Sequence, residues 1–319
     1  MSEYRIKLPE RSLNLRDLPP SNYMLSKELS DAIQVALALE QPLLITGEPG
    51  TGKTRLADRI AADLHQEASH FLPEPLIFNT QTTSLATDLF YYYDALTHFH
   101  DVNLRKAANQ EAPPISDYIE LRALGKAIAL SNPKAAGPYA EEGKPAQSAV
   151  VLIDEIDKAP RDFPNNLLNA LDRFRFQIKE DGNRTIDLGE GQKVVVVLTS
   201  NSEKSLPDAF LRRCVFFHIP FPDAEGLMRI VKAHLGEDSE YSNEQLIEHF
   251  LEVRRRVNRK EPATAELVAW LRVLELHHFL GKNLDIKNLS ATQKEILRMS
   301  YSVLAKTRED LDELIKSLG

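Results

Sequence analysis

Hydrophobic positions gather into five short runs within the first 220 residues of the chain. These runs are Leu43–Thr46, Leu76–Asn79, Val150–Ile153, Val194–Thr199 and Val215–Ile219. They are apolar throughout rather than alternating, which is typical of strands buried on both faces of a parallel sheet. Because helical patterns separate them, residues 1–222 are predicted to form one α/β layered domain.

After Pro220 and Pro222 the pattern becomes helical only. Ser242–Gln245 and Ser290–Gln293 each have the capping-box form that begins a helix. Between them, four apolar residues recur near helical spacing and are predicted to pack in a core. They are Leu267, Leu271, Leu274 and Phe279. A second, helical domain is therefore predicted over residues 223–319.

The segment from residue 80 to residue 148 is less regular. It contains three consecutive tyrosines, Tyr91–Tyr93, and a pattern that predicts a helix over Asp117–Ser131. A stretch rich in proline, glycine and glutamate, Pro133–Pro145, predicts a surface loop.

Composition is that of a globular protein with a core: 43% of the residues are hydrophobic and 27% are charged. No apolar run approaches the ~20 residues needed to cross a bilayer, so no membrane span is expected. The first residues lack the basic start and apolar stretch of an export signal. The single cysteine, Cys214, leaves no internal disulfide and favours a reducing, cytoplasmic location.

The net charge of −8 weighs against general attraction to nucleic acid or to an anionic membrane. One basic run, Arg254–Lys260, stands out against this balance. It has two interpretations: a solvated helix end whose cations suit the helix dipole, or a surface that faces a nucleotide or a partner.

A phosphate-binding motif follows the first apolar run. Its residues are Gly47, Glu48, Pro49, Gly50, Thr51, Gly52, Lys53 and Thr54, a full match to G-x-x-x-x-G-K-[ST]. The motif lies between a predicted strand and the helical pattern Arg55–His65, where glycines let backbone N–H groups point at phosphate oxygens. Lys53 is predicted to reach the β- and γ-phosphates and Thr54 to ligate Mg²⁺, with Arg55 completing the nucleotide-contacting set.

Two carboxylates follow the third apolar run. Parallel strands of an open sheet bind ligands beyond their carboxyl ends, which is where Asp154 and Glu155 are expected. We predict that Asp154 holds Mg²⁺, usually through water, and that Glu155 orients and deprotonates the attacking water. With the upstream motif, these residues predict a nucleoside triphosphatase that uses ATP, or less readily GTP.

Two further polar features follow in order along the chain. Asn201 ends the fourth run, where a polar side chain is expected near the γ-phosphate; alone it would be a turn residue. Arg212 and Arg213 directly precede the fifth run. They are either surface charges or arginines supplied to the γ-phosphate of a neighbouring subunit.

With these motifs in this order and spacing, the chain resembles an AAA+ ATPase, and within that superfamily the MoxR-type branch. The resemblance is carried by Pro42–Thr54, Leu152–Ala159 and Leu206–Cys214 and covers roughly residues 20 to 275. It implies an αβα sandwich with strand order 5-1-4-3-2 and a helical lid domain. It also implies a ring of subunits, commonly a hexamer, that binds ATP or ADP between neighbours.

The resemblance further assigns roles. Asn201 would be sensor 1, and Arg213 is the first choice of arginine finger, with Arg212 second. Tyr23–Leu25 would line the adenine pocket, and the stretch around Thr82–Tyr93 would form a pore-facing or partner-facing insert. Asp181–Gly191 would form the hairpin before sensor 1. Such ATPases often act as chaperone-like remodellers of a protein partner, commonly paired with a protein that carries a von Willebrand factor A domain.

The chain departs from this pattern in the lid. The arginine called sensor 2 often stands in a Ser-Pro-Arg segment, whereas the matching region here, Lys260–Leu267, holds no arginine. Arg259 or Lys260 could substitute, so no residue is assigned to this role.

Other readings stay open. His98 and His100 are close in sequence, but without a third ligand at metal spacing they are interpreted as structural, as is Cys214. The leading hypothesis is a remodelling ATPase. Its rivals are a DNA-acting AAA+ motor or GTPase subunit of a DNA-processing or restriction system, and a nucleotide-gated scaffold.

Overall fold

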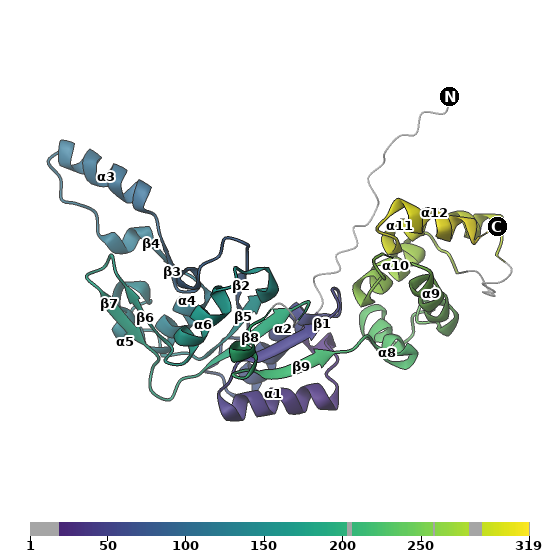
Figure 1. The fold of residues 1–319 in the computed structure, drawn as a ribbon, viewed down its shortest axis with the longest axis horizontal. Coiled ribbons are helices and arrows are strands. Elements are labelled where there is room, and N and C mark those ends of the chain that lie inside the picture. The colour runs from purple at the N-terminus through teal and green to yellow at the C-terminus, as the bar shows by residue number, and fades with distance from the viewer. Residues whose placement is uncertain (1–18, 203–205, 258, 281–288, 319) are drawn as a thin grey trace. The chain divides into compact units, whose positions relative to one another are not determined.

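A computed structural model describes residues 19–202, 206–257, 259–280 and 289–318. The chain divides into two compact units after Pro220. The first, residues 25–220, is the α/β unit, and the second combines residues 19–24 with the described residues from Phe221 onward in a helical unit (Figure 1). Each unit is described below by itself.

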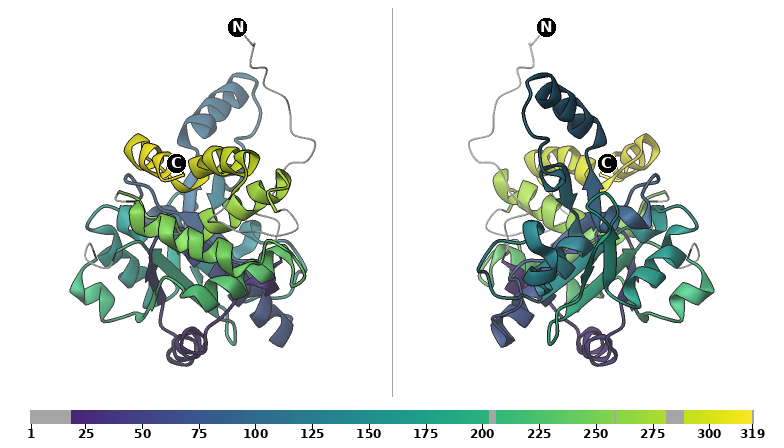
Figure 2. Two further views of the ribbon diagram at one scale, coloured as in Figure 1. Left: turned by 90° about the vertical axis from the view of Figure 1, so that its right-hand side faces the viewer. Right: turned by 90° about the vertical axis from the view of Figure 1, so that its left-hand side faces the viewer.

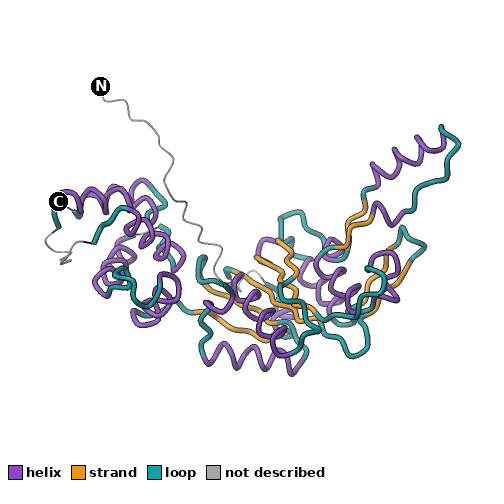
Figure 3. The backbone as a smooth tube through the Cα atoms, turned by 180° about the vertical axis from the view of Figure 1, so that it is seen from behind, coloured by secondary structure: helices purple, strands orange, loops and turns teal. Residues whose placement is uncertain are grey.

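The α/β unit is built on one five-stranded parallel sheet with flanking helices. The strands are β1 (Leu43–Gly47), β2 (Leu76–Asn79), β5 (Ala149–Asp154), β8 (Val194–Ser200) and β9 (Val215–Ile219). They lie side by side in the order β2-β5-β8-β1-β9, and all four pairings are parallel (Figure 3). Counted along the chain and taken from the other edge, this is the order 5-1-4-3-2, so the predicted fold is confirmed.

Burial separates the central strands from the edge strands. Every residue of β1 is buried, as are nearly all those of β5 and β8. In β2 and β9, by contrast, half-buried and exposed residues alternate. The prediction that all five strands are covered on both faces is therefore wrong for these two, because an edge strand has a neighbour on one side only.

Helices that precede and follow β1 along the chain pack on the sheet. They are α1 (Lys27–Leu39), α2 (Lys53–Glu67) and α4 (Ala123–Ser131). Helix α2 follows the phosphate-binding motif and packs against β5, β1 and β8, while α1 contacts β9 and β1, and α4 contacts β5 and β2. The helices α6 (Phe163–Leu171) and α7 (Asp208–Leu211) pack against each other in the same unit.

An arm departs from the unit between β2 and α4. Its elements are η2 (Ala86–Leu89), β3 (Tyr91–Tyr93), α3 (Ala95–Ala107), η3 (Ile115–Tyr118) and β4 (Ile119–Leu121). Strands β3 and β4 pair antiparallel and carry α3 at the end of the arm (Figure 2). The predicted helix over Asp117–Ser131 is thus wrong before residue 123, because Ile119–Leu121 finds a strand partner in the tyrosine run.

Two more expectations need correction. Within the predicted loop Pro133–Pro145 the chain forms two short helices, α5 (Pro133–Ala136) and η4 (Gly137–Tyr139). A hairpin does precede β8, but its strands are β6 (Arg175–Ile178) and β7 (Arg184–Asp187), so it begins earlier than the predicted Asp181–Gly191. Of the acidic residues of that stretch, Asp181 lies in the turn of the hairpin, Asp187 ends β7 and Glu190 follows it.

In its described residues, the helical unit packs five α-helices around a separate core. They are α8 (Ala224–Leu235), α9 (Glu244–Arg256), α10 (Thr264–Leu276), α11 (Ala291–Leu304) and α12 (Arg308–Lys316), with the short η1 (Pro20–Asn22) joining the same unit. The four apolar residues predicted for this core, from Leu267 to Phe279, are all buried in it.

Capping of these helices follows the sequence at one end and departs from it at another. Ser290 and Gln293 form the predicted reciprocal capping box of α11. Helix α9, however, is capped by Asn243, whose side chain accepts a hydrogen bond from the N–H of Gln245, so the cap predicted at Ser242 is misplaced by one residue.

Arg254 corrects the picture of the basic run as solvated. Its guanidinium is buried, donates to the carbonyl of Pro262 at 2.7 Å and pairs with Glu261 at 2.7 Å. It also lies 3.7 Å from the centre of the Phe221 ring, a cation–π geometry. Arg255 and Arg256 remain exposed. The first arginine of the run therefore ties α9 to the segment before α10.

Within the part of the chain that the structure describes, every helix is too short or too polar to cross a membrane.

The contribution of the α11 capping box to stability can be tested through the fluorescence of one residue. The only tryptophan, Trp270, is fully buried in the helical unit and donates to Ser300 of α11 at 2.9 Å. Replacing Ser290 with Ala removes the cap, so we expect the helical unit to lose about 1 kcal/mol of unfolding free energy. Urea titration followed by tryptophan fluorescence measures this change. Ser302→Ala, inside the same helix on an exposed position, is the control and should leave the midpoint unchanged; equal midpoints for both variants would contradict the prediction.

Candidate active site

The loop from Gly47 to Thr54 joins β1 to α2, and its first and last glycines show why the loop needs this residue. Gly47 lies so close to β9 that a Cβ atom would stand 2.8 Å from the carbonyl oxygen of Ile219. Gly52 has φ of 86°, a left-handed conformation that a residue with a Cβ atom rarely adopts, and it forms the N-cap of α2. The two glycines therefore let the loop curl tightly between strand and helix.

Lys53 is held inside this curl. Its side chain is buried, and the ammonium donates to the carbonyls of Gly47 at 2.8 Å and Glu48 at 2.9 Å. The third hydrogen bond, 3.0 Å long, goes to Oδ1 of Asn201, which follows the neighbouring strand β8. Burial lowers the pKa of Lys53, and neighbouring carboxylates, Asp154 first among them, oppose the shift. A cation is thus presented at the end of β1.

The side chains of Thr54 and Asp154 face each other at the carboxyl end of β5. The hydroxyl of Thr54 donates to both carboxylate oxygens of Asp154, at 3.0 and 3.3 Å. These donors are all oxygen, the type that Mg²⁺ prefers. Among the described residues no group of three or more His, Cys, Asp or Glu could hold a metal by itself. The pair therefore fits Mg²⁺ that completes its shell with phosphate and water, as Mg²⁺ usually does.

Glu155 directly follows β5 in a left-handed turn. Its φ and ψ are 56° and 49°, and its backbone N–H donates to the hydroxyl of Thr199 at 2.8 Å. The carboxylate forms an ion pair with Lys158, one turn further on, and this contact raises the pKa of Lys158. Both side chains are partly exposed, so the ion pair is easily exchanged for other partners.

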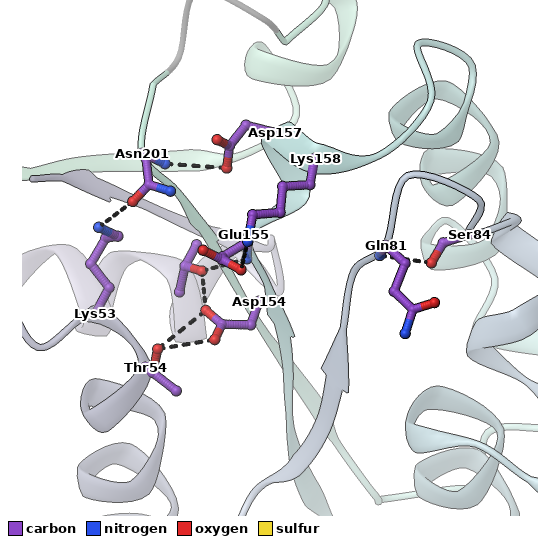
Figure 4. A network of polar contacts seen from close by, with 10 residues as sticks. Lys53, Thr54, Gln81, Ser84, Asp154, Glu155, Asp157, Lys158 and Asn201 are labelled. Carbon is purple, nitrogen blue, oxygen red and sulfur yellow. Dashed lines mark hydrogen bonds and ion pairs between the residues drawn. The ribbon is translucent and has the colours of Figure 1, made fainter. Parts of the chain in front are cut away.

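Asn201 links the lysine to the acidic turn. While its side-chain oxygen accepts from Lys53, its backbone N–H donates to Oδ1 of Asp157 at 3.2 Å. The close-up in Figure 4 shows Asn201, Lys53, Asp154 and Glu155 around one space at the ends of their strands. The structure thus brings together five of the residues singled out from the sequence: Lys53, Thr54, Asp154, Glu155 and Asn201.

Arg212 and Arg213 lie elsewhere in the unit. Both are exposed and directly precede β9, whose first residue pairs with Leu43 at the start of β1. The loop begins at Gly47, four strand positions or roughly 13 Å further along. Arg213 instead makes a loose contact with Asp172, 3.7 Å apart. The arginines therefore stand at the opposite edge of the sheet from the site of their own chain.

The remaining loop residues have local partners. The Thr51 hydroxyl donates to the carbonyl of Glu48 at 2.8 Å, which closes the turn around Pro49 and Gly50. Arg55 pairs with Asp58 one turn along α2, at 3.6 Å. These contacts shape the loop without using its inward-facing side.

The roles predicted for residues outside the α/β unit stay predictions. Tyr23 ends η1 in the helical unit, and burial raises its pKa to about 12; its adenine-pocket role stays a prediction. In the region matched to sensor 2, Arg259 and Lys260 are exposed and α10 begins at Thr264. No role is assigned to them.

The histidine pair is part of the arm. His98 accepts from or donates to the Tyr93 hydroxyl at 2.7 Å and stacks on Tyr118 with ring centres 4.6 Å apart. His100 lies beside Asp101, which in turn accepts from the Tyr118 hydroxyl at 2.8 Å. These contacts fasten α3 to the strands beneath it.

Three residues of the site were not assigned from the sequence: Asp157, Lys158 and Thr199. The contacts of Thr199 with Asp154 and Glu155 depend on the pairing of β8 with β5, which brings distant parts of the chain together. Asp157 and Lys158 depend on the turn at Glu155, which no sequence pattern announces.

A family model described as the AAA domain of the dynein-related subfamily matches residues 42–214. None of the curated proteins compared with the chain matches it. Similar solved structures include one on the structural basis for katanin self-assembly, 16% identical with a TM-score of 0.40 over 95% of this chain and 85% of that chain. A FIGL-1 AAA domain in complex with ADP is 16% identical with a TM-score of 0.44, over 97% and 93%. A RuvB mutant from Thermotoga maritima is 18% identical with a TM-score of 0.35, over 87% and 75%.

Cys214 provides a test of the packing beside β9. Its thiol donates weakly to the carbonyl of Phe210 at 3.4 Å, and burial raises its pKa to about 12. The thiolate is the reactive form, so at pH 8 we expect the folded chain to react with a disulfide reagent at least about tenfold more slowly than the urea-unfolded chain. Absorbance of the released thiol measures both rates, and equal rates would contradict the burial. As pH rises, the folded rate should keep rising beyond pH 9, where the unfolded rate levels off.

Proposed function

The chain belongs to the dynein-related subfamily of AAA domains, and from this premise we propose that it binds ATP with Mg²⁺ and hydrolyses it. The proposal rests on one observation: a buried lysine, a hydroxyl–carboxylate pair, a second carboxylate and an amide meet at the carboxyl ends of β1, β5 and β8. This is the edge where open α/β sheets bind ligands.

Each group has a part in the proposed reaction. Lys53 binds the β- and γ-phosphates, exchanging the loop carbonyls that it contacts in this structure. Thr54 and Asp154 hold Mg²⁺, which when bound neutralises the charge developing on the phosphates. Glu155 accepts a proton from the attacking water, and Asn201 fixes the distance between that water and the γ-phosphate. Such catalysis is positioning and charge stabilisation rather than covalent chemistry.

Arg213 supports a site shared between subunits. Because it precedes β9, at the end of the sheet opposite to its own phosphate-binding loop, it is out of reach of that loop's ligand. Its pairing with Asp172 is long and half-exposed, so it is released at little cost. We therefore assign Arg213, with Arg212 as second choice, to the γ-phosphate of the next subunit in a ring, proposed as a hexamer.

We further propose that hydrolysis remodels a protein partner, as in the MoxR-type branch. The net charge of −8 speaks against DNA as the substrate. The α3 arm favours a protein partner, because large apolar side chains of α3 are open to solvent: Leu96 is 84% exposed and Phe99 70%. Exposed apolar residues of this size mark interaction surfaces. A protein with a von Willebrand factor A domain is the partner class that the branch suggests.

The role of Glu155 gives the most direct variant. Glu155→Gln keeps the size of the side chain but cannot take up a proton, so we expect ATP binding within about threefold of wild type and turnover at least about 100-fold lower. A fluorescent nucleotide measures binding and phosphate release measures turnover. Lys53→Ala is the matched comparison and should lose binding itself. Normal turnover in Glu155→Gln would exclude the assignment.

The shared site can be tested by mixing two inactive variants. Arg213→Ala keeps Lys53, and Lys53→Ala keeps Arg213, so a mixed ring contains some intact interfaces and should recover part of the turnover that each variant lacks. A mixture no more active than the mean of its components would refute the shared site. Arg175→Ala, another exposed arginine in an ion pair with a carboxylate, is the control and should keep full turnover.

A further inference from the structure

Thr199 occupies a special position at the edge of the sheet. It is fully buried in β8, next to the last residue of the strand. Strands β5 and β8 are parallel, and Ile153 pairs with Leu198, so Asp154 and Thr199 follow at one level and point to one face. That face is the one covered by α2, which carries Thr54.

One hydroxyl serves both acidic residues. The Thr199 hydroxyl donates to Oδ1 of Asp154 and accepts from the backbone N–H of Glu155 at 2.8 Å. A hydroxyl has one hydrogen to donate and lone pairs to accept, so both bonds form at once. Because the group is shielded from water, each bond is stronger than it would be at the surface.

The bond to the N–H addresses a geometric problem. Side chains of consecutive strand residues point to opposite faces, so a continued β5 would send Glu155 away from Asp154. The left-handed turn at Glu155 breaks the alternation, yet this conformation is unfavourable for a residue with a Cβ atom. The turn is held from two sides: Thr199 accepts its N–H, and its carbonyl accepts the N–H of Lys158 at 2.9 Å.

We propose that Thr199 is the positioning residue of this site: its hydroxyl orients Asp154 toward the metal and fixes the backbone turn that aims Glu155 at the water. The inference rests on the proposed hydrolysis and deepens it. Thr199 itself does not touch the nucleotide. It acts through the two carboxylates, and its loss disturbs metal binding and water activation together.

Thr199→Val tests this, since valine keeps the branched shape in a buried strand and removes only the hydroxyl. We expect kcat to fall about 10- to 100-fold, as for other groups that orient metal ligands, with the KM for ATP within about threefold of wild type. The Mg²⁺ concentration for half-maximal binding of a fluorescent ATP analogue should rise several-fold. Thr199→Ser, which restores the hydroxyl, should recover both values to within about threefold.

Thr46→Val is the control. Thr46 is likewise fully buried on a central strand of the sheet, but its hydroxyl contacts His218 at 3.0 Å, away from the acidic turn. It should match wild type in kcat and Mg²⁺ dependence. If Thr199→Val fails to fold, comparison of Thr199→Ser with Thr199→Ala isolates the same hydroxyl in two small side chains.

The outcomes distinguish a failure of the role proposed for Thr199 from a failure of the proposed ATP hydrolysis. Values of kcat and Mg²⁺ half-saturation for Thr199→Val within about twofold of wild type would overturn the role of Thr199 while leaving hydrolysis established. Wild-type protein that binds the nucleotide with Mg²⁺ but releases no phosphate would overturn the proposed function. In that case the Mg²⁺ shift alone decides on Thr199: a several-fold rise supports its role, and an unchanged value refutes it.

Discussion

Parallel strands bring their carboxyl ends to one edge of a sheet, and the candidate site depends on that constraint. Lys53 begins the helix after β1, Asp154 ends β5 with Glu155 directly after it, and Asn201 follows β8, although these residues are spread over about half of the chain. The strand order places β8 between β5 and β1, so the amide of Asn201 stands between the lysine and the acidic turn. An order without β8 between β5 and β1 would separate these groups.

Opposite charges stabilise one another at this edge of the sheet. Burial lowers the pKa of Lys53 and so favours its neutral form, and the nearby carboxylates counter that tendency. The negative charge of Glu155 is in turn balanced by an ion pair with Lys158. Phosphates that displace the carbonyls around Lys53 would replace one set of oxygens with another that carries full charge. The arrangement is therefore suited to a polyanion, and its partly exposed ion pair can open.

The sequence predicted the strands of the sheet and five convergent residues because buried strands and a phosphate-binding loop have strong local signatures. The order of the strands was implied only by the resemblance to AAA+ ATPases. It failed where tertiary contacts overrode local pattern. Ile119–Leu121 reads as the start of a helix but pairs with the tyrosine run, and Arg254 reads as a surface cation but lies on Phe221. The edge strands β2 and β9 have central-strand composition without central-strand burial. The turn at Glu155, and with it the role of Thr199, has no local signature at all, because it depends on a hydroxyl 44 positions away.

The most direct measurement of the central claim is phosphate release from ATP by the purified wild-type chain, followed with Mg²⁺ and again with the metal chelated. The account predicts steady formation of ADP and phosphate in equal amounts with Mg²⁺, and none after chelation, since Thr54 and Asp154 are assigned to the metal. Tight Mg²⁺-dependent nucleotide binding with no phosphate released, alone or with a protein partner present, would contradict it and indicate a nucleotide-gated scaffold.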